Sequence, residues 1–210
     1  MVMTGKVVVL GEAVVDLVPI GPASGPLTMA AHPGGSPANV AVGLARMEVP
    51  TAFAGRLSAT GFGPWLRAHL AGNGVDLSLA VTAAENCSLA IVTLDRSAAP
   101  SYTFYVEGTA DWQWRADELP DLQAVGAPAI HTGSLAVALL PGRDLLARWV
   151  SEVHAAGRIL VSLDLNVRPT LIDDLARYRK DMVALVGHAH LVKASEEDLA
   201  FLYPGDDPVA

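Results

Sequence analysis

The most informative segment of the chain is Gly34-Gly35-Ser36-Pro37-Ala38-Asn39-Val40-Ala41-Val42-Gly43-Leu44-Ala45-Arg46. Two adjacent glycines permit backbone conformations closed to other residues and allow a ligand to approach the main chain. Ser36 is a typical N-cap, and Pro37 suits the first helical position, where its missing N–H costs nothing. Val40, Leu44 and Met47 recur at helical spacing, which predicts that they face a core. The segment therefore predicts a glycine turn followed by a capped helix.

Asn39 falls in the first turn of this predicted helix, beside free backbone N–H groups and the positive end of the helix dipole. A polar small molecule with several hydroxyls would find donors and an acceptor there. The alternative is a glycine turn and a well-capped helix with no ligand. These residues alone leave both interpretations open.

Composition limits the classes of protein to consider. The chain has 210 residues, 51% of them hydrophobic, which suffices for one α/β domain with a small insertion. Its formal net charge of −8 disfavours nucleic acid and anionic membranes as partners, because both need a basic surface. The single cysteine, Cys87, cannot form an internal disulfide and suits a reducing compartment. Neither a signal peptide nor a membrane-length apolar run is apparent, so we expect a cytoplasmic protein.

Strand and helix signals alternate along the sequence. Strands are predicted at 6–10, 52–55, 88–94, 102–106, 129–131, 159–165 and 190–193, and helices at 37–47, 64–71, 143–156, 172–186 and 196–202. Repeated β-α-β units predict an α/β fold with a mostly parallel sheet and helices on both faces. The two strands between 88 and 106 interrupt the alternation and predict a hairpin. Neither G-x-x-x-x-G-K-[ST] nor G-x-G-x-x-G after the first strand occurs, which disfavours other nucleotide-binding α/β folds.

The segment at 34–46 resembles the first signature of the PfkB, or ribokinase-like, carbohydrate kinases. That signature is Gly-Gly-x-x-x-Asn followed by an Ala-rich helix ending in Leu-Ala-Arg. Further segments match the family in order and over essentially the whole chain: Gly11-Glu12-Ala13-Val14-Val15-Asp16-Leu17-Val18-Pro19, Phe104-Tyr105, Gly108-Thr109-Ala110-Asp111, Ile130-His131-Thr132-Gly133-Ser134, Asp164-Leu165-Asn166-Val167-Arg168 and Val192-Lys193-Ala194-Ser195-Glu196-Glu197-Asp198-Leu199.

The resemblance implies a ribokinase-like domain over 1–210, with a small β lid whose strands lie around 13–30 and 88–110. It implies transfer of the ATP γ-phosphoryl group to a sugar hydroxyl with Mg²⁺, as in the fructokinase branch. The partner would be a small-molecule sugar, and a homodimer is left open. A 2-keto-3-deoxygluconate or nucleoside kinase of the same family is one alternative, and a non-catalytic sugar-binding protein is another.

The second signature of the family, a Gly-Ala-Gly-Asp run that supplies the base and the anion hole, does not occur in the sequence. By resemblance, residues 1–210 correspond to the N-terminal two thirds of a sugar kinase. The catalytic base is therefore expected beyond Ala210. We expect residues 1–210 alone to show no ATP-dependent kinase activity.

The resemblance places the sugar against Asp16, Gly34, Gly35 and Asn39. An ionised carboxylate can accept two charge-assisted hydrogen bonds from vicinal hydroxyls, which suits Asp16. The alternative for Asp16 is an exposed acidic residue at a strand end. Asn39 would be a second contact with both a donor and an acceptor.

Phe104 and Tyr105 are expected to form an apolar wall over the sugar, with ordinary cross-strand packing as the alternative. Fructokinase-like and ketodeoxygluconate-like members often carry an arginine just after this pair. Here the following residues are Val106 and Glu107, so a charged sugar acid is less well supported.

Asp164, Asn166 and Arg168 alternate at the end of a predicted strand and should project to one side. A buried ion pair is the alternative. By resemblance, Asp164, Asn166 and Lys193 lie toward phosphate, and Arg168 lies toward the substrate. Glu196 would organise Mg²⁺ through water, and this role is compatible with a capping box at 195–198.

The remaining charged residues receive no role in the site. Arg56 and Arg67 are interpreted as solvated charges. The histidines show no metal-ligand spacing apart from His188 and His190, and that pair is interpreted as structural.

Overall fold

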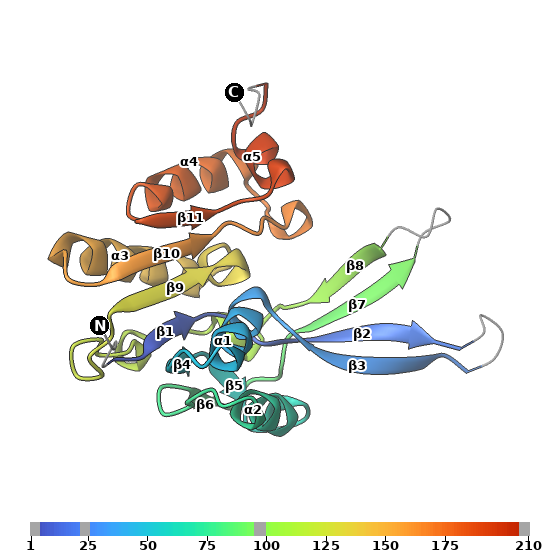
Figure 1. Ribbon diagram of the computed structural model, residues 1–210. Helices are drawn as coiled ribbons and strands as arrows, with labels where there is room; N and C mark the ends of the chain where they lie inside the picture. The colour runs from blue at the N-terminus through green and yellow to red at the C-terminus, as the bar shows by residue number, and fades with distance from the viewer. Residues whose placement is uncertain (1–4, 22–25, 95–99, 206–210) are drawn as a thin grey trace.

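The central sheet of the computed structural model has five parallel strands in the order β11-β10-β9-β1-β4 (Figure 1). The structure describes residues 5–21, 26–94 and 100–205. The strands are β1 (Val7–Leu10), β4 (Thr51–Ala54), β9 (Ala129–Gly133), β10 (Leu160–Asp164) and β11 (Leu191–Lys193). The predicted parallel α/β sheet is thus confirmed.

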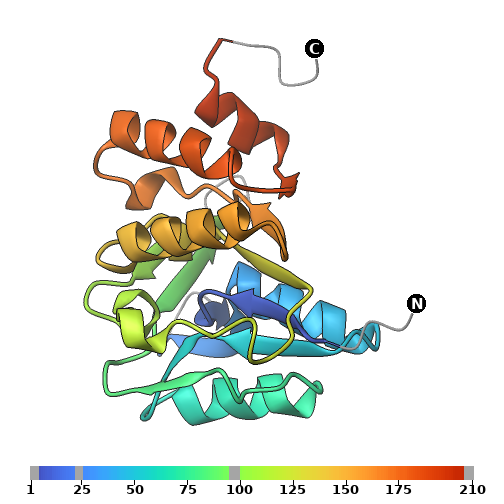
Figure 2. The ribbon, with the colours of Figure 1, turned by 90° about the vertical axis from the view of Figure 1, so that its left-hand side faces the viewer.

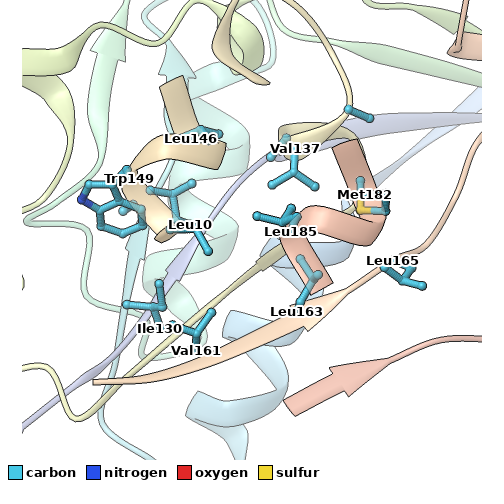
Figure 3. Close-up of a cluster of buried hydrophobic side chains, with 14 of the residues drawn as sticks. Leu10, Ile130, Val137, Leu146, Trp149, Val161, Leu163, Leu165, Met182 and Leu185 are labelled. Atoms are coloured by element: carbon cyan, nitrogen blue, oxygen red, sulfur yellow. The ribbon is translucent and has the colours of Figure 1, made fainter. Parts of the chain in front are cut away.

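Helices cover both faces of this sheet because side chains alternate along β1. Val8 and Leu10 pack in a cluster with α3 (Gly142–Ala156) and α4 (Leu175–Val186), part of which Figure 3 shows. Val9 packs on the other side with α1 (Ser36–Arg46) and α2 (Gly63–Gly72). Figure 2 shows α3 and α4 side by side. Within the described ranges, no helix is long and apolar enough to cross a membrane.

A second sheet of four strands, here called the lid sheet, extends away from this core (Figure 1). Its order is β3-β2-β7-β8, with β2 (Val14–Ile20), β3 (Thr28–Gly34), β7 (Leu89–Leu94) and β8 (Pro100–Tyr105). The β2–β3 and β7–β8 pairs are antiparallel, and β2 and β7 run parallel. The hairpin predicted between 88 and 106 is therefore present.

The start of α1 differs from the prediction. Gly35, rather than Ser36, is the N-cap residue, and Ser36 makes no capping hydrogen bond. Met47 is 67% exposed, because the face that packs against the sheet is formed by smaller residues: Pro37, Ala38, Ala41 and Val42. Helix α4 begins at Leu175, three residues after the predicted start, where the Asp174 side chain accepts a hydrogen bond from the Arg177 N–H.

The remaining elements are short. They are β5 (Arg56–Ser58), β6 (Val81–Ala83) and α5 (Glu196–Leu202), with short 3-10 helices η1 (Ala110–Trp112), η2 (Ala116–Glu118), η3 (Ser134–Val137) and η4 (Pro169–Leu171). Strands β5 and β6 pair in parallel.

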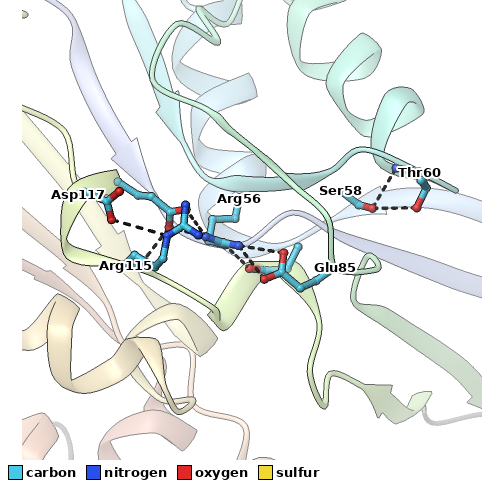
Figure 4. A network of polar contacts seen from close by, with 8 residues as sticks. Arg56, Ser58, Thr60, Glu85, Arg115 and Asp117 are labelled. Carbon is cyan, nitrogen blue, oxygen red and sulfur yellow. Dashed lines mark hydrogen bonds and ion pairs between the residues drawn. The ribbon is translucent and has the colours of Figure 1, made fainter.

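Arg56 is buried, so its interpretation as a solvated charge was wrong (Figure 4). Its Nη1 pairs with Glu118, its Nη2 lies 2.9 Å from Glu85, and its Nε donates to the carbonyl of Ala110 at 3.0 Å. Two carboxylates and a carbonyl therefore compensate the desolvation of this guanidinium. No periodic pattern indicates this burial, because β5 is only three residues long.

Candidate active site between the lid sheet and the parallel sheet

A cavity of about 470 Å³ lies between the lid sheet and the carboxyl ends of the parallel strands. In open parallel sheets, ligands bind at this edge. The lining residues are Glu12, Val14, Asp16, Gly35, Ser36, Asn39, Val40, Tyr102, Phe104, Ser134, Leu135, Asp164, Asn166, Arg168 and Lys193. Most of the residues proposed from the sequence are therefore brought together, although they lie up to 177 positions apart in the chain.

Asp16 enters the cavity from β2 and is half-buried. It pairs in register with His32 of β3, so both side chains lie on the same face of the lid sheet. Burial raises the pKa of the Asp16 carboxyl, and the nearby His32 partly opposes this shift. Gly34 lies behind the carboxylate, and a Cβ at this position would overlap Oδ2 of Asp16. The absence of a side chain at Gly34 thus leaves room for Asp16.

Gly35 has a φ of 97°, a conformation that residues with a Cβ rarely adopt. A Cβ here would lie 2.6 Å from the carbonyl oxygen of Glu12. The glycine therefore lets α1 begin directly against the end of β1. Asn39, in the first turn of α1, is exposed and lines the cavity as predicted.

The aromatic wall consists of Tyr102 and Phe104, whose rings stack with centroids 6.0 Å apart. Tyr105 does not line the cavity and is 56% exposed. Successive side chains in a strand point to opposite faces, so Phe104 and Tyr105 cannot both face one ligand. The two-residue period of β8 was the signal that could have identified Tyr102 in place of Tyr105.

Asp164, the last residue of β10, is buried and forms an ion pair with Lys193 of β11 at 3.1 Å. Its Oδ2 also accepts a hydrogen bond from Ser36 Oγ at 3.2 Å. The hydroxyl of Ser36 is thus directed to Asp164, which explains why it does not cap α1. The ion pair and the position in the cavity coexist, because Lys193 keeps most of its side chain exposed.

Asn166 and Arg168 line the same cavity but lie beyond the end of β10. Asn166 has a φ of 39°, and its Nδ2 donates to Ser134 Oγ at 2.9 Å. Nη1 of Arg168 donates to the Val167 carbonyl at 2.9 Å. An irregular segment fixed by these contacts, rather than strand alternation, directs both side chains toward the cavity.

Glu12 is a cavity residue that we had not singled out from the sequence. It follows β1, is fully buried, and its Oε2 accepts a hydrogen bond from the Ala136 N–H at 3.2 Å. Burial raises the pKa of Glu12 to about 7, although hydrogen bonds from Ser134 and Ala136 lower it in part. A buried carboxyl of raised pKa in a cavity is typical of functional sites. Its place between Gly11 and Asp16 in the quoted motif was the available signal.

Glu196 is exposed at the start of α5 and does not line the cavity. Among the described residues, no group of three or more His, Cys, Asp or Glu side chains is arranged to hold a metal ion. Mg²⁺ requires fewer protein ligands than this, since it usually keeps several waters and contacts one or two carboxylates. Of the two carboxylates expected near the metal, Asp164 lines the cavity and is available to contact it directly or through water.

The family model described as pfkB family carbohydrate kinase matches residues 4–207. The chain is 37% identical over 209 residues to a fructokinase of Klebsiella pneumoniae, covering 99% of this chain and 66% of the relative. It is 35% identical to a fructokinase of Salmonella typhimurium, with 98% and 65% covered. The chain thus spans about two thirds of the length of these relatives.

Solved structures show the same fold. A fructokinase of Xylella fastidiosa with bound ATP superposes with a TM-score of 0.85 at 28% identity, covering 94% of this chain and 63% of that one. A fructokinase of Vibrio cholerae in a fructose-, ADP- and calcium-bound form gives a TM-score of 0.84 at 29% identity, with 98% and 65% covered. With the family model matching nearly its whole length, the chain belongs to the pfkB family of carbohydrate kinases.

Proposed function

We propose that the protein containing this chain transfers the γ-phosphoryl group of ATP to a hydroxyl of a sugar, with fructose as the first substrate to test. The observation that carries the proposal is the cavity, which has Asp16 on its lid side and Asp164 and Lys193 on its sheet side. Relatives with fructose, ADP or ATP bound support this choice of substrates.

The lid side of the cavity suits a sugar. The half-buried Asp16 carboxylate accepts hydrogen bonds from hydroxyl groups, and Asn39 both donates and accepts. Gly35 lines the cavity, whereas Gly34 does not line it and contributes by leaving room for the Asp16 carboxylate. Tyr102 and Phe104 cover the apolar face of the ring.

The sheet side suits phosphate. Lys193 is cationic and Asn166 adds a side-chain amide donor, whereas the cationic Arg168 is assigned to the sugar. Phosphoryl transfer depends on in-line positioning and charge stabilisation more than on covalent chemistry, and Lys193 and Asn166 can supply both to the phosphate. Mg²⁺, when bound, neutralises charge on the phosphate oxygens. We place it near Asp164 and, through water, Glu196. We assign no catalytic base among the described residues.

We further propose that the protein is cytoplasmic and that its partner is a small-molecule sugar rather than nucleic acid or a membrane. The net charge of −8 disfavours nucleic acid and anionic membranes as partners, because polyanionic partners require basic surfaces. Sedimentation equilibrium of the purified protein distinguishes a monomer from a homodimer.

The proposed activity is tested by ADP release from the purified intact protein, with ATP, Mg²⁺ and fructose. We expect fructose-dependent ADP release and a fructose phosphate product in equal amounts. A second assay replaces fructose with 2-keto-3-deoxygluconate or a nucleoside. If one of these compounds is turned over and fructose is not, the choice of fructose as substrate is wrong. If fructose binds but is not turned over, the proposed kinase activity is wrong.

A further inference from the structure

The lid sheet joins the core through a small group of buried polar residues around Asp111. Oδ1 of Asp111 accepts the N–H of Ala13, the residue before β2, at 2.9 Å. Oδ2 lies 2.6 Å from the hydroxyl of Ser88, the residue before β7. Thr109, in the segment after β8, lies 2.6 Å from the same hydroxyl. Asp111, Ser88 and Thr109 are at most 7% exposed.

One carboxyl group therefore contacts the base of two lid strands directly and that of a third through one hydroxyl. Two backbone bonds reinforce the junction, from the Val15 N–H to the Ser88 carbonyl at 3.0 Å and from the Ala110 N–H to the Asn86 carbonyl at 2.9 Å. The same strands carry the residues that line the cavity, with Asp16 on β2 and Tyr102 and Phe104 on β8. The orientation of those side chains thus depends on how the strand bases are held.

A count of protons indicates the charge state of this group. Three oxygen–oxygen contacts form a chain from Asp111 Oδ2 to Ser88 Oγ, from Ser88 Oγ to Thr109 Oγ1, and from Thr109 Oγ1 to the Val106 carbonyl at 2.8 Å. Each of these three contacts needs one hydrogen between its two oxygens, and the two hydroxyls supply only two. A third hydrogen on the carboxyl completes the chain, with the Asp111 O–H donating to Ser88, Ser88 to Thr109 and Thr109 to the carbonyl.

The surroundings favour the neutral form of Asp111 at acidic pH. An ionised Asp111 also repels a charge on Glu12, and this repulsion contributes to the raised pKa of Glu12. Cys87 lies next to Ser88 in the chain, and Arg56 is directed to the Ala110 carbonyl and to Glu85 and Glu118 instead of to Asp111. Burial raises the pKa of Asp111 to about 6, although hydrogen bonds from the Ser88 hydroxyl, from the Ala13 and Ser88 backbone and from its own backbone lower it in part.

We propose that Asp111 is a positioning residue which, as a neutral acid, fixes the bases of β2, β7 and β8 and thereby holds Asp16 and Phe104 over the cavity. Its sugar-binding consequence rests on the proposed function, whereas its effect on the strand bases does not. The proposal requires a hydrogen-bond donor and an acceptor at position 111, not a charge. An asparagine supplies both, so Asp111→Asn should preserve the junction and Asp111→Ala should break it.

The first readout is hydrogen exchange of the Ala13 amide, measured at pH 5 on the purified intact protein. We expect its protection factor to fall at least tenfold in Asp111→Ala and to stay within threefold of the native value in Asp111→Asn. The Val161 amide, which donates to His190 Nδ1 at 3.0 Å far from the junction, should be unchanged in both variants. An Ala13 amide equally protected in all three proteins overturns the proposal even if the protein is no kinase.

The second readout is the KM for fructose against the KM for ATP. We expect Asp111→Ala to raise the fructose KM at least tenfold and the ATP KM less than twofold. Between pH 5 and pH 8 the ratio of fructose KM in the native protein to that in Asp111→Asn should rise at least threefold, because only the native residue loses a proton. An Asp111→Asn variant as impaired as Asp111→Ala overturns the neutral-acid role.

Thr109→Val provides a variant that removes one hydroxyl without a change of size. We expect it to raise the fructose KM about threefold or more, whereas Thr103→Val, the same change at an exposed residue of β8, leaves it within twofold. If Asp111→Ala does not fold, these two variants and Asp111→Asn decide the question. Equal fructose KM in Thr109→Val and Thr103→Val contradicts the proposal, and failure of the native protein to turn over fructose contradicts the proposed function alone.

Discussion

The backbone N–H of Val167 donates a 2.8 Å hydrogen bond to Oδ1 of Asp198, 31 positions farther along the chain. Oδ2 of the same side chain accepts the N–H of Ser195 at 2.9 Å, and Ser195 Oγ accepts the N–H of Asp198 at 3.1 Å. The capping box of α5 therefore also holds the segment that carries Asn166 and Arg168. A motif that stabilises a helix start thus helps to position two cavity residues.

Replacing Asp198 by asparagine should destabilise the fold. Both carboxylate oxygens accept backbone N–H groups, and an asparagine would direct its own NH₂ group at one of them. We expect a loss of about 1–3 kcal/mol in the free energy of unfolding, measured with urea. Asp173→Asn, at an exposed position, is the control and should remain within about 0.5 kcal/mol of the native protein. Equal stability of the two variants would show that the Val167 contact contributes nothing.

Asp16→Asn should weaken sugar binding while leaving the fold intact. The substitution keeps the volume of the side chain but removes a charged acceptor, at a cost of about 1.5–3 kcal/mol, or roughly 10- to 150-fold in affinity. Calorimetric titration with fructose measures the change, and circular dichroism checks the fold. An unchanged affinity in a folded variant would contradict the assignment of Asp16 to the sugar.

Gly35→Val should abolish sugar binding. The residue has a φ of 97°, and any Cβ would press against the Glu12 carbonyl. We expect a left-handed conformation to cost about 1–2 kcal/mol, with the steric overlap in addition. Gly43→Ala in α1 is the matched control, because a Cβ there meets open space. That variant should be as stable as the native protein or more so by about 1 kcal/mol, with unchanged affinity. Normal binding by Gly35→Val would show that the glycine pair is only a turn.

Stability should fall as the pH rises from about 4.5 through 7, and Glu12→Gln should reduce this fall. The pKa of Glu12 is raised in the folded protein to about 7 from 4.5, so folding favours the protonated form. The stabilising contribution is present below the unfolded pKa and is lost above the folded one. A shift of this size corresponds to a difference on the order of 3 kcal/mol between pH 4 and pH 8. Urea unfolding at several pH values, in parallel on both proteins, measures it. Parallel curves for the two proteins would exclude Glu12 as a titrating group in this range.

The sequence predicted the order of strands and helices well, because apolar runs and periodicity report local burial. Helix α3 is an example, since Leu146, Trp149 and Val150 recur at helical spacing and are buried, and Gly157 ends the helix in a left-handed conformation. The parallel sheet followed from the alternation of elements. The family motifs also located most of the cavity, since their glycines and polar residues lie at the carboxyl ends of strands.

The errors concern contacts between distant segments. The sequence predicted that Ser36 caps its own helix, but its hydroxyl instead donates a hydrogen bond to Asp164, 128 positions away. Arg56 was interpreted as solvated because nothing near it in the chain shows that Glu118 lies alongside. The sequence motif predicted the adjacent aromatics Phe104 and Tyr105 for the cavity wall, whereas a strand presents alternate residues, here Tyr102 and Phe104, to one face. Such partners are set by tertiary packing, which local propensity does not encode.

Strand β1 contributes Val8 and Leu10 to one hydrophobic cluster and Val9 to the other. The hydrophobic clusters on the two faces of the parallel sheet therefore share one strand of four residues near the start of the chain. Neither cluster can lose its packing without exposing a strand that the other requires, so the two should melt in a single cooperative transition. The backbone amides of β1 should accordingly exchange with solvent only when the whole domain opens.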